Sequence, residues 1–184
     1  MKFKFDVNLN DNDYFEFNKF MAIKSTYGKK QLNSMRILFA VGMVILMLIS
    51  LLGGGFTISS LVNIIPYAII AIIVFFTLPF FYISTLKSQM KSLKKTGKMA
   101  FSPSSVIEFY DDLIIETTAS SKTEVEFTTV ERFSIVQDKY VYVHLNNITA
   151  YILPRKSFES QEQYNEFLEF IKTKSNNIDI YQNI

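Results

Sequence analysis

The hydrophobic pattern is dominated by one uncharged stretch, the fifty residues between Arg36 and Lys87. A helix needs about 20 apolar residues to cross the roughly 30 Å hydrocarbon core of a bilayer. Fifty residues therefore fit two spans and a turn, and the pattern predicts spans over about 35–53 and 60–83. Three glycines at 53–55 and polar residues between 57 and 60 supply the turn. We expect residues 35–86 to form a transmembrane hairpin; the alternative is a pair of core helices in a soluble protein.

The second predicted span contains Pro66 and Pro79, and proline kinks a helix because it removes a backbone donor. Each kink can be static or act as a hinge, and the pattern leaves both interpretations open. No ionisable residue lies at membrane depth, so the usual machinery of an ion-coupled transporter is missing.

The N-terminal segment, residues 1–34, begins with alternating apolar positions at Phe3, Phe5, Val7 and Leu9. This period of two predicts a short strand, which needs a sheet elsewhere and most plausibly pairs with the C-terminal one. After capping residues at 10–13, helical spacing predicts a helix that runs to about Tyr27 and ends at Gly28. The helix can lie at the membrane interface or pack on the C-terminal domain, and its pattern fits both.

The C-terminal region, residues 99–175, changes to short β-prone runs. Six runs lie between 106 and 153, separated by turn residues such as Asp111-Asp112 and Asn146-Asn147. Ser160 followed by Gln163 then predicts the start of an amphipathic helix. We expect an α+β fold in which a small antiparallel β-sheet or barrel is capped by a C-terminal helix. This is the order of elements in a pleckstrin-homology (PH)-like domain, and residues 176–184 are left as a tail.

The whole plan resembles the YcxB-like family. The resemblance rests on the helix start Asn10-Asp11-Asn12-Asp13-Tyr14, the two spans, and the segment 151–158, which reads YILPRKSF. The family often has a Trp before its mid-domain strand, whereas this chain has Thr129-Val130 there and no Trp. The family has no established activity, so the resemblance implies a fold and a membrane location but no mechanism.

Charge is segregated along the chain, although its net value is only +2. Residues 17–107 contain no acidic residue and carry +10, whereas 1–16 carry −2 and 108–184 carry −6. Because basic flanks stay inside, we expect a multi-pass protein of the cell (inner, cytoplasmic) membrane with both termini in the cytoplasm. The acidic domain would repel phosphates, so no nucleic-acid partner is expected.

The sequence carries few residues suited to catalysis or metal binding. The chain has no Cys and a single His, His144, which excludes thiolate metal sites and makes a catalytic triad a poor fit. We expect His144 at the surface or partly buried. There is no P-loop, Rossmann or nucleophile-elbow pattern. The expectation is therefore no enzyme, with no catalytic, cofactor-binding or metal residues and no cofactor.

Two basic segments, the juxtamembrane residues 87–98 and the turn at 155–156, are the candidate contacts for an anionic lipid or ligand. Near a helix start, Arg155 and Lys156 can bind an anion. Alternatively, Pro154 rigidifies the strand exit and Phe158 packs on the last helix. The full set of candidates is Lys87, Lys91, Lys94, Lys95, Lys98, Arg155 and Lys156.

We therefore expect a non-enzymatic integral membrane protein that presents a cytoplasmic PH-like binding or regulatory module. Its expected partners are membrane lipids and a protein partner, and a homo-oligomer is left open. The alternatives are an immunity-like protein that protects the membrane from a toxin, and a small transporter component.

Overall fold

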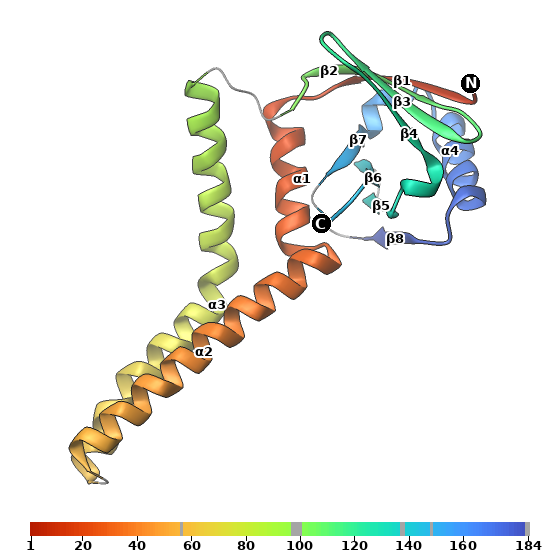
Figure 1. The fold of residues 1–184 in the computed structure, drawn as a ribbon. Coiled ribbons are helices and arrows are strands. Elements are labelled where there is room, and N and C mark those ends of the chain that lie inside the picture. Colours follow the sequence, from red (N-terminus) through yellow and green to blue (C-terminus); the bar gives the residue numbers. More distant parts are fainter. Residues whose placement is uncertain (56, 97–100, 137–138, 148, 183–184) are drawn as a thin grey trace. The chain divides into compact units, whose positions relative to one another are not determined.

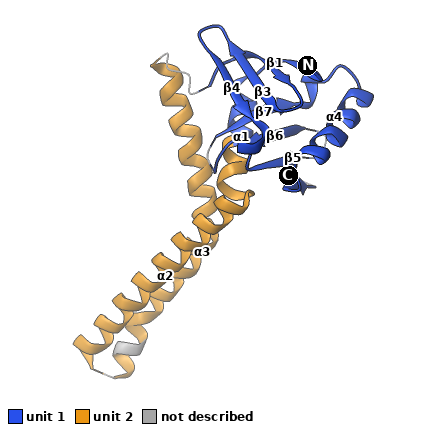
Figure 2. Ribbon diagram, turned by 45° about the vertical axis from the view of Figure 1, so that its right-hand side comes forward, with its two compact units in different colours: residues 1–17, 98–184 blue, residues 18–97 orange. Residues whose placement is uncertain are grey.

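The computed structural model describes residues 1–55, 57–96, 101–136, 139–147 and 149–182, without the side chains of residues 60 and 61 (Figure 1). The described chain divides into two compact units (Figure 2). We call residues 1–17 with 98–184 the sheet unit, and residues 18–97 the helical unit. Among the predicted positions, Asp138 in one turn, Ile148 at one strand start and Lys98 lie outside the described residues.

The first sheet of the sheet unit is antiparallel, in the order β1-β2-β3-β4. Its strands are β1 (Phe3–Asn8), β2 (Ser104–Phe109), β3 (Leu113–Thr118) and β4 (Lys122–Glu126). The N-terminal strand pairs with β2, which confirms the prediction that it joins the C-terminal sheet. Phe5 and Val7 face the core and are buried, because the alternating pattern puts them on one face of β1.

The second sheet has the order β7-β6-β5-β8. Its strands are β5 (Arg132–Val136), β6 (Tyr140–His144), β7 (Ala150–Pro154) and β8 (Ile178–Tyr181). The segment expected to be a tail contains β8, which pairs with β5 in parallel. A sheet of antiparallel strands alone was expected, so this parallel edge is a difference from the sequence analysis.

The described strands do not close into a barrel, so of the two predicted alternatives, a sheet or a barrel, the barrel is wrong. The chain leaves the first sheet after Glu126 and makes a 3₁₀ turn, η1 (Phe127–Thr129), before β5 begins. The described strands then form two separate four-stranded sheets, with no ladder between them. The α+β class and the C-terminal helix α4 (Gln161–Lys174) are confirmed. As predicted, Ser160 caps this helix, and its hydroxyl oxygen accepts from the Gln163 N–H at 3.1 Å.

One hydrophobic core joins both sheets and α4. Phe167 of α4 is fully buried at its centre, with ring centroids 5.0 Å from Phe5 and 4.9 Å from Phe109. Phe158, which follows the 3₁₀ turn η2 (Arg155–Ser157), packs on Tyr164 at 5.0 Å. Helix α4 therefore covers the open end of the two sheets with aromatic rings.

The helices divide differently from the prediction near Gly28. Helix α1 (Asp11–Ile23) ends earlier, and α2 (Thr26–Gly54) already contains Gly28. The Ser25 hydroxyl makes the corner, because it donates to the Met21 carbonyl at 2.7 Å and accepts from the Gly28 N–H at 2.9 Å. A Cβ on Gly28 would lie 2.0 Å from the Met21 carbonyl oxygen, so glycine here permits close approach rather than ending a helix.

Helices α2 and α3 (Ile58–Lys95) pack together, and both are long and apolar enough to span a membrane (Figure 1). Gly55, with φ 69°, ends α2 in a conformation that favours glycine. Within α3, Pro79 has no N–H for the Phe75 carbonyl four residues earlier. Arg36 of α2 fills this gap, since its Nε donates to the Phe75 carbonyl at 3.2 Å.

Candidate functional site

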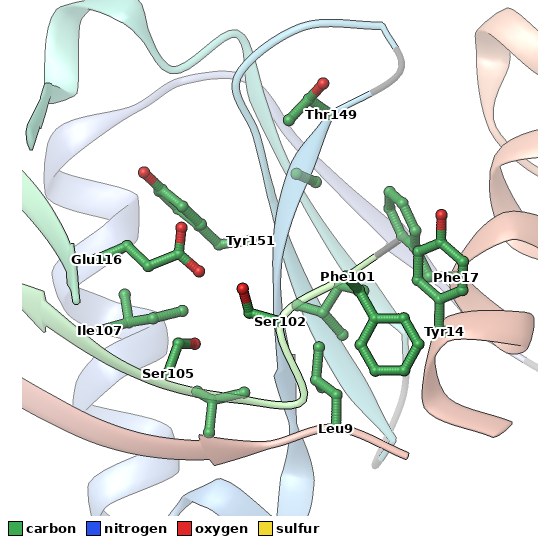
Figure 3. Close-up of a pocket in the computed structure, with 13 residues that line it drawn as sticks. Leu9, Tyr14, Phe17, Phe101, Ser102, Ser105, Ile107, Glu116, Thr149 and Tyr151 are labelled. Carbon is green, nitrogen blue, oxygen red and sulfur yellow. The ribbon is translucent and has the colours of Figure 1, made fainter. Parts of the chain in front are cut away.

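The sheet unit contains a pocket of about 590 Å³ (Figure 3). It lies beside β1 and β7, the edge strands of the two sheets, which approach each other without forming a ladder. The first turns of α1 and residues 101–102 complete its wall. The pocket therefore lies where β1 and β7 would have to pair if the two sheets closed into a barrel.

The pocket has a polar side and an apolar side. In Figure 3 the side chains of Glu116, Ser102 and Ser105 gather on one side with Tyr151, and Leu9, Tyr14 and Phe101 lie on the other. Of the described residues that line it, none is Lys or Arg. Among these described lining residues, the Glu116 carboxylate is the only charged group.

Glu116 is partly buried on β3, opposite Ile107 of β2. Because side chains alternate along a strand, Glu116 shares the core-facing side of β3 with the fully buried Ile114. Burial raises the pKa of Glu116 above its usual value, and a hydrogen bond with the Ser105 side chain acts in the opposite direction. No ion pair to Glu116 is found within the described ranges.

Tyr151 of β7 lies close to this carboxylate (Figure 3). Its side chain is 7% exposed, and its hydroxyl has no hydrogen-bond partner in the described part of the chain. Burial and the charge of Glu116 raise the pKa of Tyr151 to about 12, so the hydroxyl stays protonated at neutral pH. A buried hydroxyl without a partner is costly, and here it belongs to a residue that lines the pocket.

The apolar side is aromatic. Tyr14 and Phe101 stack with ring centroids 4.7 Å apart. Phe17 also lines the pocket and meets Tyr142 of β6 edge to face at 5.2 Å. These rings offer a flat apolar surface to a ligand.

A separate ionic cluster fixes the start of α1 inside the sheet unit. Asp13 is 6% exposed and accepts from Lys156 Nζ at 2.7 Å, from the Tyr140 hydroxyl at 2.9 Å and from the Asn10 N–H at 3.0 Å. Burial alone would raise the pKa of Asp13, but these three donors outweigh it and lower the pKa below its usual value. Burial and the hydrogen bond to Asp13 raise the pKa of Tyr140.

None of the described basic candidates from the sequence lines the pocket. Lys156 pairs with Asp13. The Arg155 guanidinium lies 4.8 Å from the Tyr164 ring centroid and donates to the Gln161 side-chain oxygen at 2.7 Å. Four candidates are exposed on the C-terminal part of α3, namely Lys87, Lys91, Lys94 and Lys95. Lys98 lies outside the described residues.

His144 is fully buried, not at the surface or partly buried as expected. Its Nε2 lies 2.9 Å from the Ser134 hydroxyl. Burial, together with the charge of Arg132, lowers the pKa of His144 to about 3, so the ring is neutral at physiological pH. Across the described ranges, no three His, Asp or Glu side chains are grouped as a metal site would require.

Neither Glu116 nor Tyr151 was among the site residues predicted from the sequence. A signal was present for Glu116, because it shares strand parity with Ile114 and thus falls on the apolar face of its strand. No comparable signal marked Tyr151, since tyrosines also occur throughout buried sheets.

Residues 109–171 match the model of the YcxB-like protein family. The chain carries a YcxB-like domain. The match runs from the end of β2 into α4 and includes Glu116, Tyr151 and Lys156. No curated protein and no solved structure matches the chain. The matched residues thus supply Glu116 and Tyr151 of the polar side, whereas Ser102, Ser105 and the rings of the apolar side lie before them.

Proposed function

We propose that α2 and α3 cross the cell membrane as a hairpin and hold the YcxB-like domain at the cytoplasmic face. There the domain acts as a non-enzymatic, PH-like module that binds a protein partner through its pocket.

The exposed apolar side chains of α2 and α3 support the membrane part of this proposal. Leu52 is 75% exposed and Phe76 is 67% exposed, and almost none of the most apolar part of either helix is buried. A core helix of a soluble protein buries its apolar face, and water would penalise this much exposed apolar surface. A lipid bilayer suits both helices. It accepts their exposed apolar side chains, and a helix satisfies its backbone N–H and C=O groups by internal hydrogen bonds.

The orientation follows from the lysines at the two open ends of the hairpin. Lys29 and Lys30 lie in the first turns of α2, and Lys94 and Lys95 lie in the last turn of α3. The positive-inside rule then assigns both ends to the cytoplasm. Lysines on this part of α3 would also contact anionic headgroups, each at about 1 kcal/mol near the surface.

The pocket supports the binding role. Its lining combines a half-buried carboxylate, an unpartnered tyrosine hydroxyl and aromatic rings, which is typical of a ligand site. Apart from the helices α1 to α3 between β1 and β2 and the added β8, the strands and the C-terminal helix also follow the element order of PH-like modules.

Single-cysteine labelling tests the topology, since the chain has no native Cys. Thr57→Cys lies in the turn between the spans, and Ser120→Cys lies in an exposed turn of the domain. A membrane-impermeant maleimide should label the Thr57 variant in intact cells and the Ser120 variant only after lysis. Recovery of the protein in the soluble fraction, or the reverse labelling, would refute the proposed placement.

Site-specific photo-crosslinking in cells tests the partner. A photoreactive residue at Thr149, an exposed pocket-lining position, should give a discrete protein adduct. The same residue at Lys122, exposed on β4 and away from the pocket, is the matched control. Equal adducts at both positions, or none at Thr149, would contradict a pocket-directed partner.

A further inference from the structure

We propose that the pocket beside β7 binds a primary ammonium group carried on an apolar, ring-sized body. The proposal rests on the proposed binding function and names the chemistry that the site recognises.

The polar side of the pocket selects a cation. Glu116 offers a carboxylate, and among the described lining residues there is no Lys or Arg to neutralise it. An anionic ligand would be repelled, because two negative charges would share a partly desolvated site. A cation is instead attracted, because its charge and its N–H donors replace the water that burial removes from the carboxylate.

The number of acceptors favours an ammonium group. A primary ammonium has three N–H donors and no acceptor. The two carboxylate oxygens of Glu116 and the unpartnered hydroxyl of Tyr151 supply three acceptors. Binding would thus give the buried Tyr151 oxygen the partner that it lacks.

The free edge of β7 adds backbone acceptors. The Arg155 N–H donates to the Lys139 carbonyl at 2.7 Å, and the Leu145 N–H donates to the Thr149 carbonyl at 3.0 Å. In an antiparallel ladder these bonds recur at every second residue, so the backbone of Tyr151 faces β6. The carbonyls of Ala150 and Ile152 therefore point away from β6, on the edge that lines the pocket.

The apolar side sets the body of the ligand. The stacked rings of Tyr14 and Phe101, with Leu9 beside them, suit an aromatic or similarly flat group. The pocket volume of about 590 Å³ falls in the range of small-ligand sites, roughly 300–1,000 Å³. The ligand is thus amphipathic, with its charge at Glu116 and its ring at Tyr14.

The test is a methyl NMR titration of the full-length protein in phosphatidylcholine nanodiscs. The probe is 4-phenylbutylammonium, and its matched analogues are 4-phenylbutanol and 4-phenylbutanoate. Methyl shifts of Ile107 and Ile152, which line the pocket, report binding at the site rather than partition into lipid. The ammonium should bind with a dissociation constant on the order of 1 mM or tighter, and at least tenfold more tightly than either analogue.

Variants assign the effect to the pocket. Glu116→Gln should weaken ammonium binding at least tenfold, and Tyr151→Phe should weaken it severalfold. Glu124→Gln is the matched control, because Glu124 is exposed on β4 and pairs with Lys122. Equal binding of the three probes or unchanged binding to the Glu116 variant would overturn the proposal. So would the absence of methyl shifts at an ammonium concentration 10-fold above the expected dissociation constant.

Two further arms identify the source of the ammonium group. Competition by the tripeptide acetyl-Phe-Lys-Phe-amide, but not by its acetyl-lysine copy, would indicate a lysine of a protein partner. Phosphatidylethanolamine carries a primary ammonium in its headgroup, so weaker probe binding in nanodiscs that contain it would indicate a lipid. If neither the tripeptide nor this lipid competes with the probe, the source is a free amine. If the ammonium fails to bind while the Thr149 crosslink persists, the ammonium class is wrong and the proposed function stands.

Discussion

Replacing Asp13 by Asn should release the first turns of α1 from the sheet unit. The carboxylate accepts from Lys156, Tyr140 and Asn10, whereas the single amide oxygen of Asn can replace only part of this set. Each hydrogen bond to a charged group is worth about 1.5–3 kcal/mol. The Lys156 side chain is 50% exposed, so water can solvate its ammonium group when the contact breaks. The Lys156 contact therefore contributes less to stability than a fully buried hydrogen bond would.

The expected loss is about 2–3 kcal/mol of the local stability of α1, or about 30- to 150-fold in its opening equilibrium. Hydrogen exchange of the full-length protein, followed by mass spectrometry of peptides that cover residues 11–17, measures this opening directly. Asp11→Asn is the matched control, because Asp11 is exposed in the same first turn and has the same favourable interaction with the helix dipole.

The pH dependence gives an independent check. The folded state lowers the pKa of Asp13 below 3.8, so its contribution is fully present above about pH 4 to 5. The contribution is lost as the pH falls through the lowered folded pKa, and Asp13→Asn should lack this loss. If Asp13→Asn speeds exchange no more than Asp11→Asn, or keeps the acid sensitivity of the native protein, the ionic cluster does not hold the start of α1.

Three further substitutions test the helical corner, the proline gap and the pocket carboxylate. Gly28→Ala should disrupt the corner between α1 and α2, by about 3 kcal/mol or more, because its Cβ would meet the Met21 carbonyl. Unfolding in detergent measures this loss. Gly42→Ala is the control, because Gly42 has open space around it, and it should change the free energy of unfolding by no more than about 1 kcal/mol. Arg36→Met should destabilise the hairpin by about 1 kcal/mol, because the Phe75 carbonyl loses its donor. The loss should be smaller in a Pro79→Ala background, where the backbone N–H of the new alanine can bond to this carbonyl. A double-mutant cycle measures the difference, and equal losses in both backgrounds would contradict the prediction. Glu116→Gln should stabilise the domain in hydrogen exchange at pH 7, because burial penalises the ionised acid whose pKa is raised, and the gain should vanish below about pH 4. A less stable Glu116 variant at pH 7 would refute this.

Local signals in the sequence account for most elements of the fold. The uncharged stretch predicts α2 and α3, and the β-prone runs predict six strands from β2 to β7 because each signal repeats within a few residues. The start of α4 follows from Ser160 and Gln163 alone. For β8 the signal was too short, since its four residues gain their place only by pairing with β5.

Contacts between distant residues decide the rest. Lys156 is a surface cation in the sequence, but it pairs with Asp13, 143 positions away. The pocket likewise needs β1 and β7 to lie together without pairing, which no local pattern encodes. Periodicity and charge act along the chain and are therefore readable from it. Burial of Glu116 and the missing partner of Tyr151 depend on which strands become edges, and packing of the whole sheet unit sets that.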